Sequence, residues 1–489
     1  MTEPRIVPRD EHPISRRDID PDALKVLYRL RQFDHIAYLV GGSVRDLLLG
    51  RRPKDFDIGT SAHPYQVKKL FRNCWIIGRR FRLAHVKFGE KVIEVATFRR
   101  QIAQGEEVVQ DAVPAPVLPE TVEAAAGAPA PAHRQAYVDG RDNEHLIHRD
   151  NTFGSPEEDA FRRDFTINAL FYDIATFSII DYVDGLDDLR ARVVRAIGDP
   201  DVRLCEDPVR MIRAIALAAR LDFSIEPALL EAIRAHRREI AKSSPARLLE
   251  EYYKILRAGA AEATFRNLAE VGLLESTSGE LHRGATQPLW RSLAALDTYR
   301  RRFDATPETL SNAILLGSLL APLGITLHGR RSEDRAGHGG HRPGESEPTA
   351  LDARDADAGE HGSVPVRPAR PAAPPYPDRR APEPKLGDLP IARRDVERLR
   401  HIIGLQRRLR DLTASPRAQR ALAHRHIFRE ALTWLEIHGD APDLVEHWNA
   451  LMGDGTERAA PAAEEDGVGF RRPRRRRRRR RSRSLKSEV

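Results

Sequence analysis

The sequence predicts an α+β protein, with a small mixed β-sheet and helices in its N-terminal part and only helices in the remainder. Between residues 34 and 100, short apolar runs alternate with amphipathic stretches, which is typical of strands and helices in turn. Residues 200–280 contain several helical patterns, the clearest being DPVRMIRAIALAARLDF, and helices are expected to continue to about Leu323. Stretches without periodicity interrupt these ordered parts.

The composition changes along the chain predict six segments. We expect a mobile N-terminus and two disordered low-complexity regions, one inserted within the N-terminal unit and one forming a linker. The expected segments are a mobile N-terminus (1–22), an α/β unit (23–175) with a flexible insertion (104–143), a helical part (176–327), a disordered linker (328–388), a helical segment (389–453) and a disordered Arg-rich tail (454–489).

The N-terminal unit is expected to alternate strands and helices. A strand leads into Gly41-Gly42, which opens a helix, and a hairpin turning at Gly89-Glu90 closes this part. The expected strands are 35–40, 55–59, 82–88 and 91–98, and the expected helices are 62–73 and a later one over 157–173 that leads into a strand.

Composition limits the class of protein and its compartment. Hydrophobic residues make up 41% of the chain, yet no apolar run of about 18 residues is present and the N-terminus has no signal-peptide core, so we expect no membrane and a cytoplasmic location. The two cysteines are too few for a disulfide framework. The net charge of +8 is concentrated in the tail: residues 471–489 carry eleven Arg, one Lys and one Glu, which is 12 − 1 = +11, so the other residues sum to 8 − 11 = −3.

The first candidate site is LVGGSVRDLLLG, residues 39–50. Glycines at a strand-to-helix junction allow close backbone approach to a ligand, and the first N–H groups of a helix can bind phosphate. Gly41, Gly42, Ser43 and Arg45 are therefore candidates to contact a nucleotide. The alternative is that the glycines only make a tight turn and that Arg45 pairs with Asp46.

The second candidate is KDFDIGT, residues 54–60. Asp55 and Asp57 are two apart on an expected strand, so both carboxylates should project to one face, where they would repel each other. A divalent cation such as Mg²⁺ relieves that repulsion and is commonly bound by one or two carboxylates together with substrate phosphates. The alternative is that one aspartate caps a turn while the other points to solvent.

A third carboxylate, Glu94, lies in the otherwise apolar strand VIEVATF. Val92 and Ala96 share its face, so that face should be core unless Glu94 meets a metal site. Alternatively, Glu94 pairs with an arginine such as Arg99.

Together, GGxxRD, DxD and a later strand with an acidic residue resemble the head of the class II polymerase β-type nucleotidyltransferases. That family comprises bacterial poly(A) polymerases and the enzymes that add CCA to transfer RNA. The resemblance implies a nucleotidyltransferase head followed by helical neck, body and tail domains. It also implies that Asp55, Asp57 and Glu94 bind two Mg²⁺ ions, with ATP as substrate and RNA 3′ ends as partner.

The resemblance gives roles to two later motifs. In RRDFTINAL (162–170) it assigns Arg163, Asp164 and Asn168 to the nucleotide sugar and phosphates, although the cluster could also be a capped helix start; Asp164 is an alternative third metal ligand. In CEDPVRMIRA (205–214) the family uses EDxxR to read the base, which implicates Asp207, Arg210 and Arg213. Asp207 and Arg210 are expected on one helical face, with Asp207 at the N-cap and Pro208 at N1 as the purely structural reading.

WIIGRRFRLAHV (75–86) is similar to a signature of bacterial poly(A) polymerases, so the expected reaction is template-independent addition of AMP to RNA. The Arg-rich tail fits a polymerase that holds arbitrary RNA ends, because a flexible polycation binds phosphates regardless of sequence. Two alternatives remain: a CCA-adding enzyme, and an inactive RNA-binding adaptor led by the tail.

Overall fold

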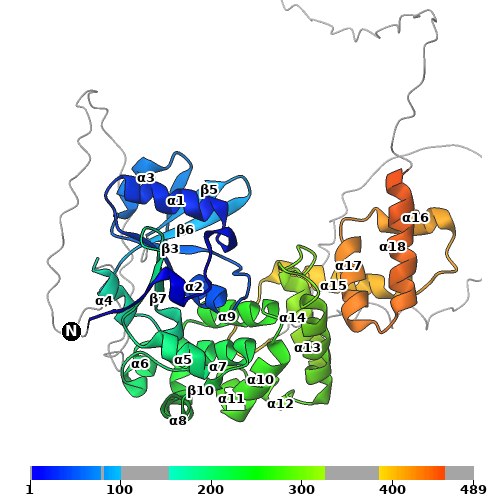
Figure 1. The fold of residues 1–489 in the computed structure, drawn as a ribbon. Helices are drawn as coiled ribbons and strands as arrows, with labels where there is room; N and C mark the ends of the chain where they lie inside the picture. Colours follow the sequence, from blue (N-terminus) through cyan, green and yellow to red (C-terminus); the bar gives the residue numbers. More distant parts are fainter. Residues whose placement is uncertain (1–2, 79–81, 101–152, 325–384, 458–489) are drawn as a thin grey trace, which may run out of the picture.

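The protein is described by a computed structural model over residues 3–78, 82–100, 153–324 and 385–457. Within these ranges the N-terminal part is built on an eight-stranded sheet and the rest is almost entirely helical, which confirms the α+β class (Figure 1). The expected insertion at 104–143, nearly all of the expected linker at 328–388 and the Arg-rich run of the tail lie outside the described residues.

The sheet is mixed: its strands follow the order β1-β8-β7-β2-β3-β6-β5-β4, and only β3 and β6 run parallel. The predicted hairpin is confirmed as β5 and β6, whereas the sequence gave no signal for β1, β4 and β8. The strands are β1 (Arg5–Val7), β2 (Ala37–Val40), β3 (Asp57–Thr60), β4 (Cys74–Ile77), β5 (Leu83–Phe88), β6 (Lys91–Thr97), β7 (Leu170–Asp173) and β8 (Ser178–Asp181), with a separate parallel pair of β9 (Val193–Val194) and β10 (Ser224–Ile225).

The N-terminal segment is part of the fold, so the expectation of a mobile 1–22 is wrong for its described residues. Strand β1 pairs antiparallel with β8 at the edge of the sheet, and Val7 is buried. Asp20 then caps the next helix, because its Oδ1 accepts hydrogen bonds from the Asp22 and Ala23 amides at 2.8 and 3.4 Å. The polar character of the segment hid a short strand that gains its hydrogen bonds from a partner far along the chain.

One face of the sheet is covered by α1 and α3, which lie over the strands β2 to β6 (Figure 1). Side chains alternate accordingly: Ala84, Val86, Ile93 and Val95 on this face are all buried. The other face carries the residues between them, including Glu94, and remains open along β4, β5 and β6.

Helices make up the remainder, and their bounds follow the chain. They are α1 (Pro21–Gln32), α2 (Gly42–Leu48), α3 (Pro64–Leu70), α4 (Pro156–Phe161), α5 (Gly185–Ala191), α6 (Pro200–Glu206), α7 (Val209–Leu221), α8 (Pro227–His236), α9 (Pro245–Arg257), α10 (Ala261–Glu270), α11 (Leu273–Thr277), α12 (Gly279–Arg283), α13 (Gln287–Arg300), α14 (Asn312–Leu320), α15 (Arg393–Leu409), α16 (Pro416–Ala423), α17 (Phe428–His438) and α18 (Pro442–Glu457), with short 3₁₀ turns between them. No helix among the described residues combines the length and the apolarity needed to cross a bilayer.

The segment α15–α18 packs on the preceding helices through α14 and α13 and shares their apolar core. Gly317 in α14 makes this contact possible, because a Cβ atom there would lie 2.5 Å from the ring of Trp434 and 2.6 Å from Leu399. The described end of the expected linker is also packed, with Leu386 fully buried. Residues on both sides of the undescribed stretch 325–384 therefore belong to one folded body.

The ends of the undescribed stretch 101–152 meet at the sheet. Arg99 and Phe153 form an antiparallel bridge, and the Gly154 amide donates to the Phe98 carbonyl at 2.9 Å. The ring of Phe153 also contacts His63 edge to face, at a centroid distance of 4.3 Å. Chain entry and exit at this point are thus fixed by the fold.

Candidate active site

The Gly41-Gly42 junction connects β2 directly to α2. Gly41 has a φ of +73°, a conformation that suits glycine, and its amide donates to the Leu170 carbonyl at 3.1 Å. A Cβ atom at Gly41 would lie only 3.0 Å from Nη1 of Arg163, so the glycine lets this guanidinium approach the backbone. Ser43 is buried and donates to the Val40 carbonyl at 2.9 Å, which is a structural contact.

Arg45 is buried and links two motifs. Its Nε and Nη2 donate to Asp46 at 2.8 and 2.6 Å, as the structural alternative predicted. Its Nη1 also donates to the side-chain oxygen of Asn168, in the later motif RRDFTINAL. Arg45 therefore holds the start of α2 against the segment that follows α4.

Asp55 and Asp57 are placed differently from the expectation that both lie on a strand. Only Asp57 begins β3, whereas Asp55 lies in the preceding loop with a side chain 72% exposed and 3.8 Å from Nζ of Lys54. Pro53 in that loop cannot donate a ladder hydrogen bond, which favours a strand that starts after it.

Glu94 lies beside Asp57 on the open face of the sheet. Because β3 and β6 are parallel with Ile58 opposite Val95, the preceding residues Asp57 and Glu94 are neighbours on the same face. This face is not core: Val92 is 43% exposed, and the Glu94 side chain is half exposed. The partner of Glu94 is His85, with Nε2 3.6 Å from Oε1, rather than Arg99.

The electrostatics of Asp57 show that these carboxylates interact. Burial among the surrounding protein atoms, then the negative charges of Glu94 and Asp55, raise the pKa of Asp57 to about 6, although solvent reaches the side chain; Arg163 opposes the rise. Among the described residues, no group of three or more His, Cys, Asp or Glu side chains is close enough to hold a metal ion. The carboxylates thus repel one another at short range without forming a closed cage.

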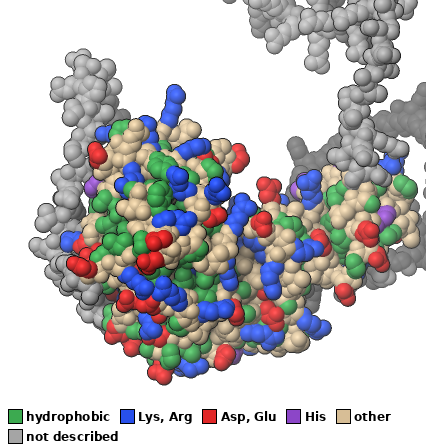
Figure 2. Space-filling model, in the orientation of Figure 1, with side chains coloured by type: hydrophobic (Ala, Val, Ile, Leu, Met, Phe, Trp, Pro, Cys, Tyr) green, Lys and Arg blue, Asp and Glu red, His purple; other side chains and the backbone are tan. Residues whose placement is uncertain are grey.

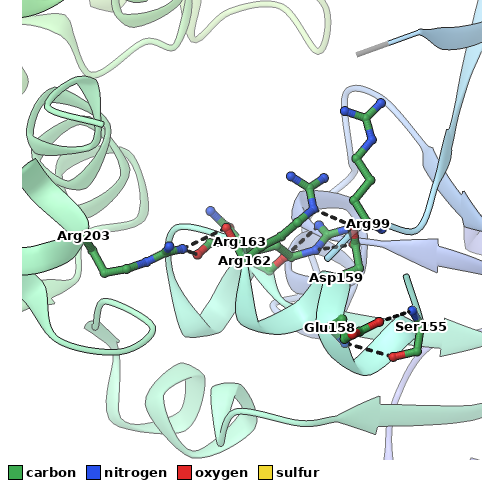
Figure 3. Close-up of polar contacts among 8 residues, drawn as sticks. Arg99, Ser155, Glu158, Asp159, Arg162, Arg163 and Arg203 are labelled. Atoms are coloured by element: carbon green, nitrogen blue, oxygen red, sulfur yellow. Dashed lines mark hydrogen bonds and ion pairs between the residues drawn. The ribbon is translucent and has the colours of Figure 1, made fainter. Parts of the chain in front are cut away.

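Asp159 on α4 orients the arginines of the next motif. Its Oδ1 accepts from Arg162 Nε at 3.0 Å, and its Oδ2 accepts from Arg163 Nε and Nη2 at 3.1 and 2.8 Å (Figure 3). Burial alone would raise the pKa of Asp159, but Arg163 and Arg162 outweigh it and lower that pKa. Helix α4 ends at Phe161, so the predicted helix over 157–173 is too long, and these arginines leave it at its C-terminal end.

Asp164 and Asn168 are bound within the protein. Asp164 is buried; its Oδ1 accepts from Asn168 Nδ2 at 3.1 Å, and its Oδ2 lies 2.7 Å from Nη2 of Arg213 on α7. Burial raises the pKa of Asp164, but the charge of Arg213 and the Asn168 hydrogen bond lower it further. A continuous polar chain therefore runs from Asp46 through Arg45, Asn168 and Asp164 to Arg213.

The EDxxR motif adopts a geometry that differs from the predicted one. Helix α7 begins at Val209 with Pro208 at its N-cap, so Asp207 is neither the N-cap nor on the helical face of Arg210. Arg210 instead donates to Glu206 at 3.2 Å and to the Arg203 carbonyl at 2.8 Å. Pro208 separates α6 from α7, and the motif spans the break.

Several residues that complete this site gave no sequence signal of their own. Arg247 on α9 binds Asp207 through both guanidinium Nη atoms, at 3.1 and 2.9 Å. Arg203 donates to the carbonyls of Arg162 and Arg163 and so connects α6 to the catalytic sheet (Figure 3). Asp159 could have been found from its spacing of four residues to Arg163, whereas Arg247 could not, because 40 residues separate it from Asp207.

The surface around these motifs is rich in cations. Lys and Arg side chains are prominent on the middle of the face shown in Figure 2, where the sheet unit meets the helical part. Exposed members near the motifs include Arg51, Arg52 and Lys54 in the loop before β3, and Arg220 at the end of α7. Such a surface can attract a polyanion.

Comparisons with known proteins agree with the motifs. Residues 37–195 match the poly A polymerase head domain, residues 222–282 the probable RNA and SrmB-binding site of polymerase A, and residues 382–483 the polymerase A arginine-rich C-terminus. A poly(A) polymerase I of Salmonella typhimurium is 48% identical over 270 residues, which are 55% of this chain and 52% of that protein. A CCA-adding enzyme of Lactobacillus johnsonii is 33% identical over 257 residues, 53% of this chain and 55% of that protein.

The chain spans about half the length of the curated relatives it matches. Among solved structures, the Bacillus stearothermophilus CCA-adding enzyme in complex with CTP aligns with a TM-score of 0.52 at 23% identity, covering 89% of this chain and 83% of that chain. This likeness supports the fold.

Proposed function

We propose that this chain, which belongs to the poly A polymerase head-domain family, is a nucleotidyltransferase that adds AMP from ATP to RNA 3′ ends without a template and releases pyrophosphate. The observation that carries the proposal is the carboxylate group of Asp57, Glu94 and Asp55 next to the Gly41-Gly42 junction. All of these residues lie within the range 37–195 that matches the head domain.

The chemistry of this carboxylate group fits Mg²⁺. Carboxylate oxygens are the ligands that Mg²⁺ prefers, and the raised pKa of Asp57 reports a repulsion that a divalent cation would relieve. A closed protein cage is not required, because Mg²⁺ usually keeps water and takes substrate phosphates as further ligands. When bound, two Mg²⁺ ions would activate the primer 3′-hydroxyl and neutralise charge on the leaving pyrophosphate.

We assign the third ligand position to Glu94 rather than Asp164. Glu94 shares the open face with Asp57, whereas both carboxylate oxygens of Asp164 are bound by Asn168, Arg213 and the Phe165 amide. Asp164 and Asn168 then act on the nucleotide through the neighbours they position. Arg163, which already lowers the pKa of Asp57, is the cation best placed to meet a triphosphate at the Gly41 backbone.

Base selection is assigned to the region of Asp207 and Arg210. A carboxylate can accept from the exocyclic amine of adenine, and a guanidinium can donate to a ring nitrogen. Arg247 and Glu206 hold these two groups in place, so the base would meet a preformed set of donors and acceptors. The helical part after the sheet unit is proposed to bind RNA, in line with the match at residues 222–282.

Labelled RNA incubated with Mg²⁺ and each nucleoside triphosphate tests the proposal. We expect a long ladder with ATP and little extension with the other three. Extension that stops after C, C and A on transfer RNA would establish a CCA-adding enzyme instead.

The adaptor alternative is tested separately with Asp57→Asn and Asp55→Asn. Both changes remove a negative charge with little change in shape, so folding should persist while incorporation falls by at least 100-fold. Full incorporation by the double variant would contradict the catalytic assignment.

A further inference from the structure

The open face of the sheet carries a row of side chains that extends away from the carboxylates. Glu94 on β6 lies opposite His85 on β5, and His85 lies opposite Trp75 on β4. Directly opposite residues point to the same face of a sheet. Asp57, Glu94, His85 and Trp75 therefore form one row across four strands, with the carboxylates at one end and the indole at the other.

Trp75 is exposed at the edge of this row. It is 52% exposed, and its neighbour on the same strand and face, Ile77, is 51% exposed. The other tryptophans, Trp290, Trp434 and Trp448, are at most 8% exposed. A large aromatic side chain in such a position indicates a binding surface more often than a core residue does.

We propose that this face, defined by Trp75, Ile77 and His85 and called here the aromatic row, binds the single-stranded 3′ segment of the RNA primer, with a base stacked on Trp75. The inference rests on the proposed function, because the RNA 3′-hydroxyl must reach the carboxylates at the other end of the same row. Sheets that present aromatic side chains are a recurrent platform for unstacked bases.

Distance and charge fit this occupant. Adjacent strands are about 4.8 Å apart, so the three steps from β3 to β4 place Trp75 roughly 14 Å from Asp57. That distance corresponds to about two to four nucleotides upstream of the reacting end at a spacing of ~3.4 to 6 Å per nucleotide. Exposed cations, namely Arg72, Arg82 and Lys87, flank β4 and β5 and can meet the phosphates.

Stacking on a side chain also suits an enzyme that extends arbitrary RNA. Every base has a π-face, so an indole holds a strand with little preference for sequence. Lys87 lies on the same face as Trp75, since it is two residues from His85 in β5, and adds a sequence-independent contact. The aromatic row therefore explains how the primer end can be aligned without reading its bases.

Tryptophan fluorescence of the full chain tests the contact directly. Since Trp75 is the exposed tryptophan, single-stranded oligoadenylate should protect it from acrylamide quenching, and the protection should vanish in Trp75→Phe, whose remaining tryptophans are buried. A blunt RNA duplex of equal charge is the control, because the Arg-rich tail binds both RNAs through phosphates but only the single strand has free bases to stack.

Primer kinetics give the second measurement. Trp75→Ala should raise the KM for primers of about six nucleotides by on the order of ten-fold and leave the KM for ATP unchanged, whereas a dinucleotide primer, too short to reach β4, should show no effect. Trp75→Tyr should restore most of the affinity. Tyr65→Ala is the matched control, because Tyr65 is also 52% exposed but lies on α3, which packs on the opposite face of the sheet.

The two proposals fail in different ways. Unprotected Trp75 in the wild-type protein, or an equal primer KM for Trp75→Ala at every primer length, overturns the aromatic row while polymerisation itself stands. If the wild-type chain incorporates no nucleotide, the proposed function fails, and the fluorescence measurement alone decides whether single-stranded RNA binds Trp75.

Discussion

Arg247 on α9 donates two hydrogen bonds to Asp207, from Nη1 to Oδ1 at 3.1 Å and from Nη2 to Oδ2 at 2.9 Å. The carboxylate proposed to read the base is thus held by a guanidinium from the next part of the helical body. Bidentate contacts of this kind fix the orientation of both groups.

Removing this contact should relax base selection. In Arg247→Ala, Asp207 loses its orientation, so we expect kcat/KM for ATP to fall by about ten-fold and the ratio of ATP to CTP use to narrow. Arg247→Lys keeps the charge without the fork and should be intermediate. Arg266→Ala, which breaks an exposed pair with Glu262 on α10, is the control, and an unchanged ATP to CTP ratio in Arg247→Ala would contradict the assignment.

The pair of Asp164 and Arg213 should stabilise the junction between the sheet and α7. Arg213→Met leaves Asp164 buried without its cation, at a cost of about 3 kcal/mol in the free energy of unfolding. The double variant Asp164→Asn/Arg213→Met should recover much of that loss, because no charge then remains unpaired. Urea unfolding of both single variants and the double variant measures the coupling, and additive effects would rule it out.

Asp57 should make the stability of the metal-free protein depend on pH. Its pKa is raised to about 6 in the folded state, from an ordinary value of 3.8, so ionisation disfavours the fold. Stability is therefore lost as pH rises from about 4 through 6. Asp57→Asn cannot ionise, so its Tm should exceed that of the wild-type protein at pH 8 and approach it toward pH 4.

Mg²⁺ provides the complementary measurement on Asp57. Added Mg²⁺ should raise the Tm of the wild-type protein at pH 8 and have a smaller effect on Asp57→Asn, since a ligand that binds the folded state stabilises it. Asp304→Asn, at a residue whose side chain is 90% exposed, should respond as the wild-type protein does. Equal Mg²⁺ responses in all three proteins would remove Asp57 from the metal site.

His438 should produce the opposite dependence at acid pH. Burial lowers the pKa of His438 from 6.5 to about 4, and its Nε2 lies 2.9 Å from the Ser318 hydroxyl. The unfolded chain takes up the proton first, so stability is lost as pH falls from about 6.5 to 4, by roughly 2 kcal/mol. His438→Gln should flatten this acid limb in a thermal melt, whereas His401→Gln, on the exposed side of α15, should leave it unchanged.

The sequence predicted those parts of the site that depend on local patterns. The strand-turn-helix at Gly41, the hairpin of β5 and β6, and the helix of α7 were all visible as periodicities or as turn chemistry. Local pattern could not predict β1, β4 and β8, because each is short and owes its strand conformation to pairing with a partner elsewhere in the sheet.

The site residues show the same division. Asp57 and Glu94 were correctly expected to approach each other, since register follows from adjacent parallel strands. Asp207 and Arg210 were wrongly placed on one helix, because Pro208 was assigned to N1 and in fact forms the N-cap. The partners of Asp207 and Glu94, namely Arg247 and His85, are set by tertiary packing and by strand register, which residue spacing alone does not encode.

The bridge between Arg99 and Phe153 has a consequence for protein engineering. Because the fold itself holds these two positions together, the number of residues between them can change at an entropic cost that grows only with the logarithm of the length, about 0.6 kcal/mol per doubling. Residues 101–152 are therefore a place where a fluorescent reporter or an affinity tag can be inserted. Such a chimera would carry its label a short distance from His63 and the catalytic sheet without interrupting any strand.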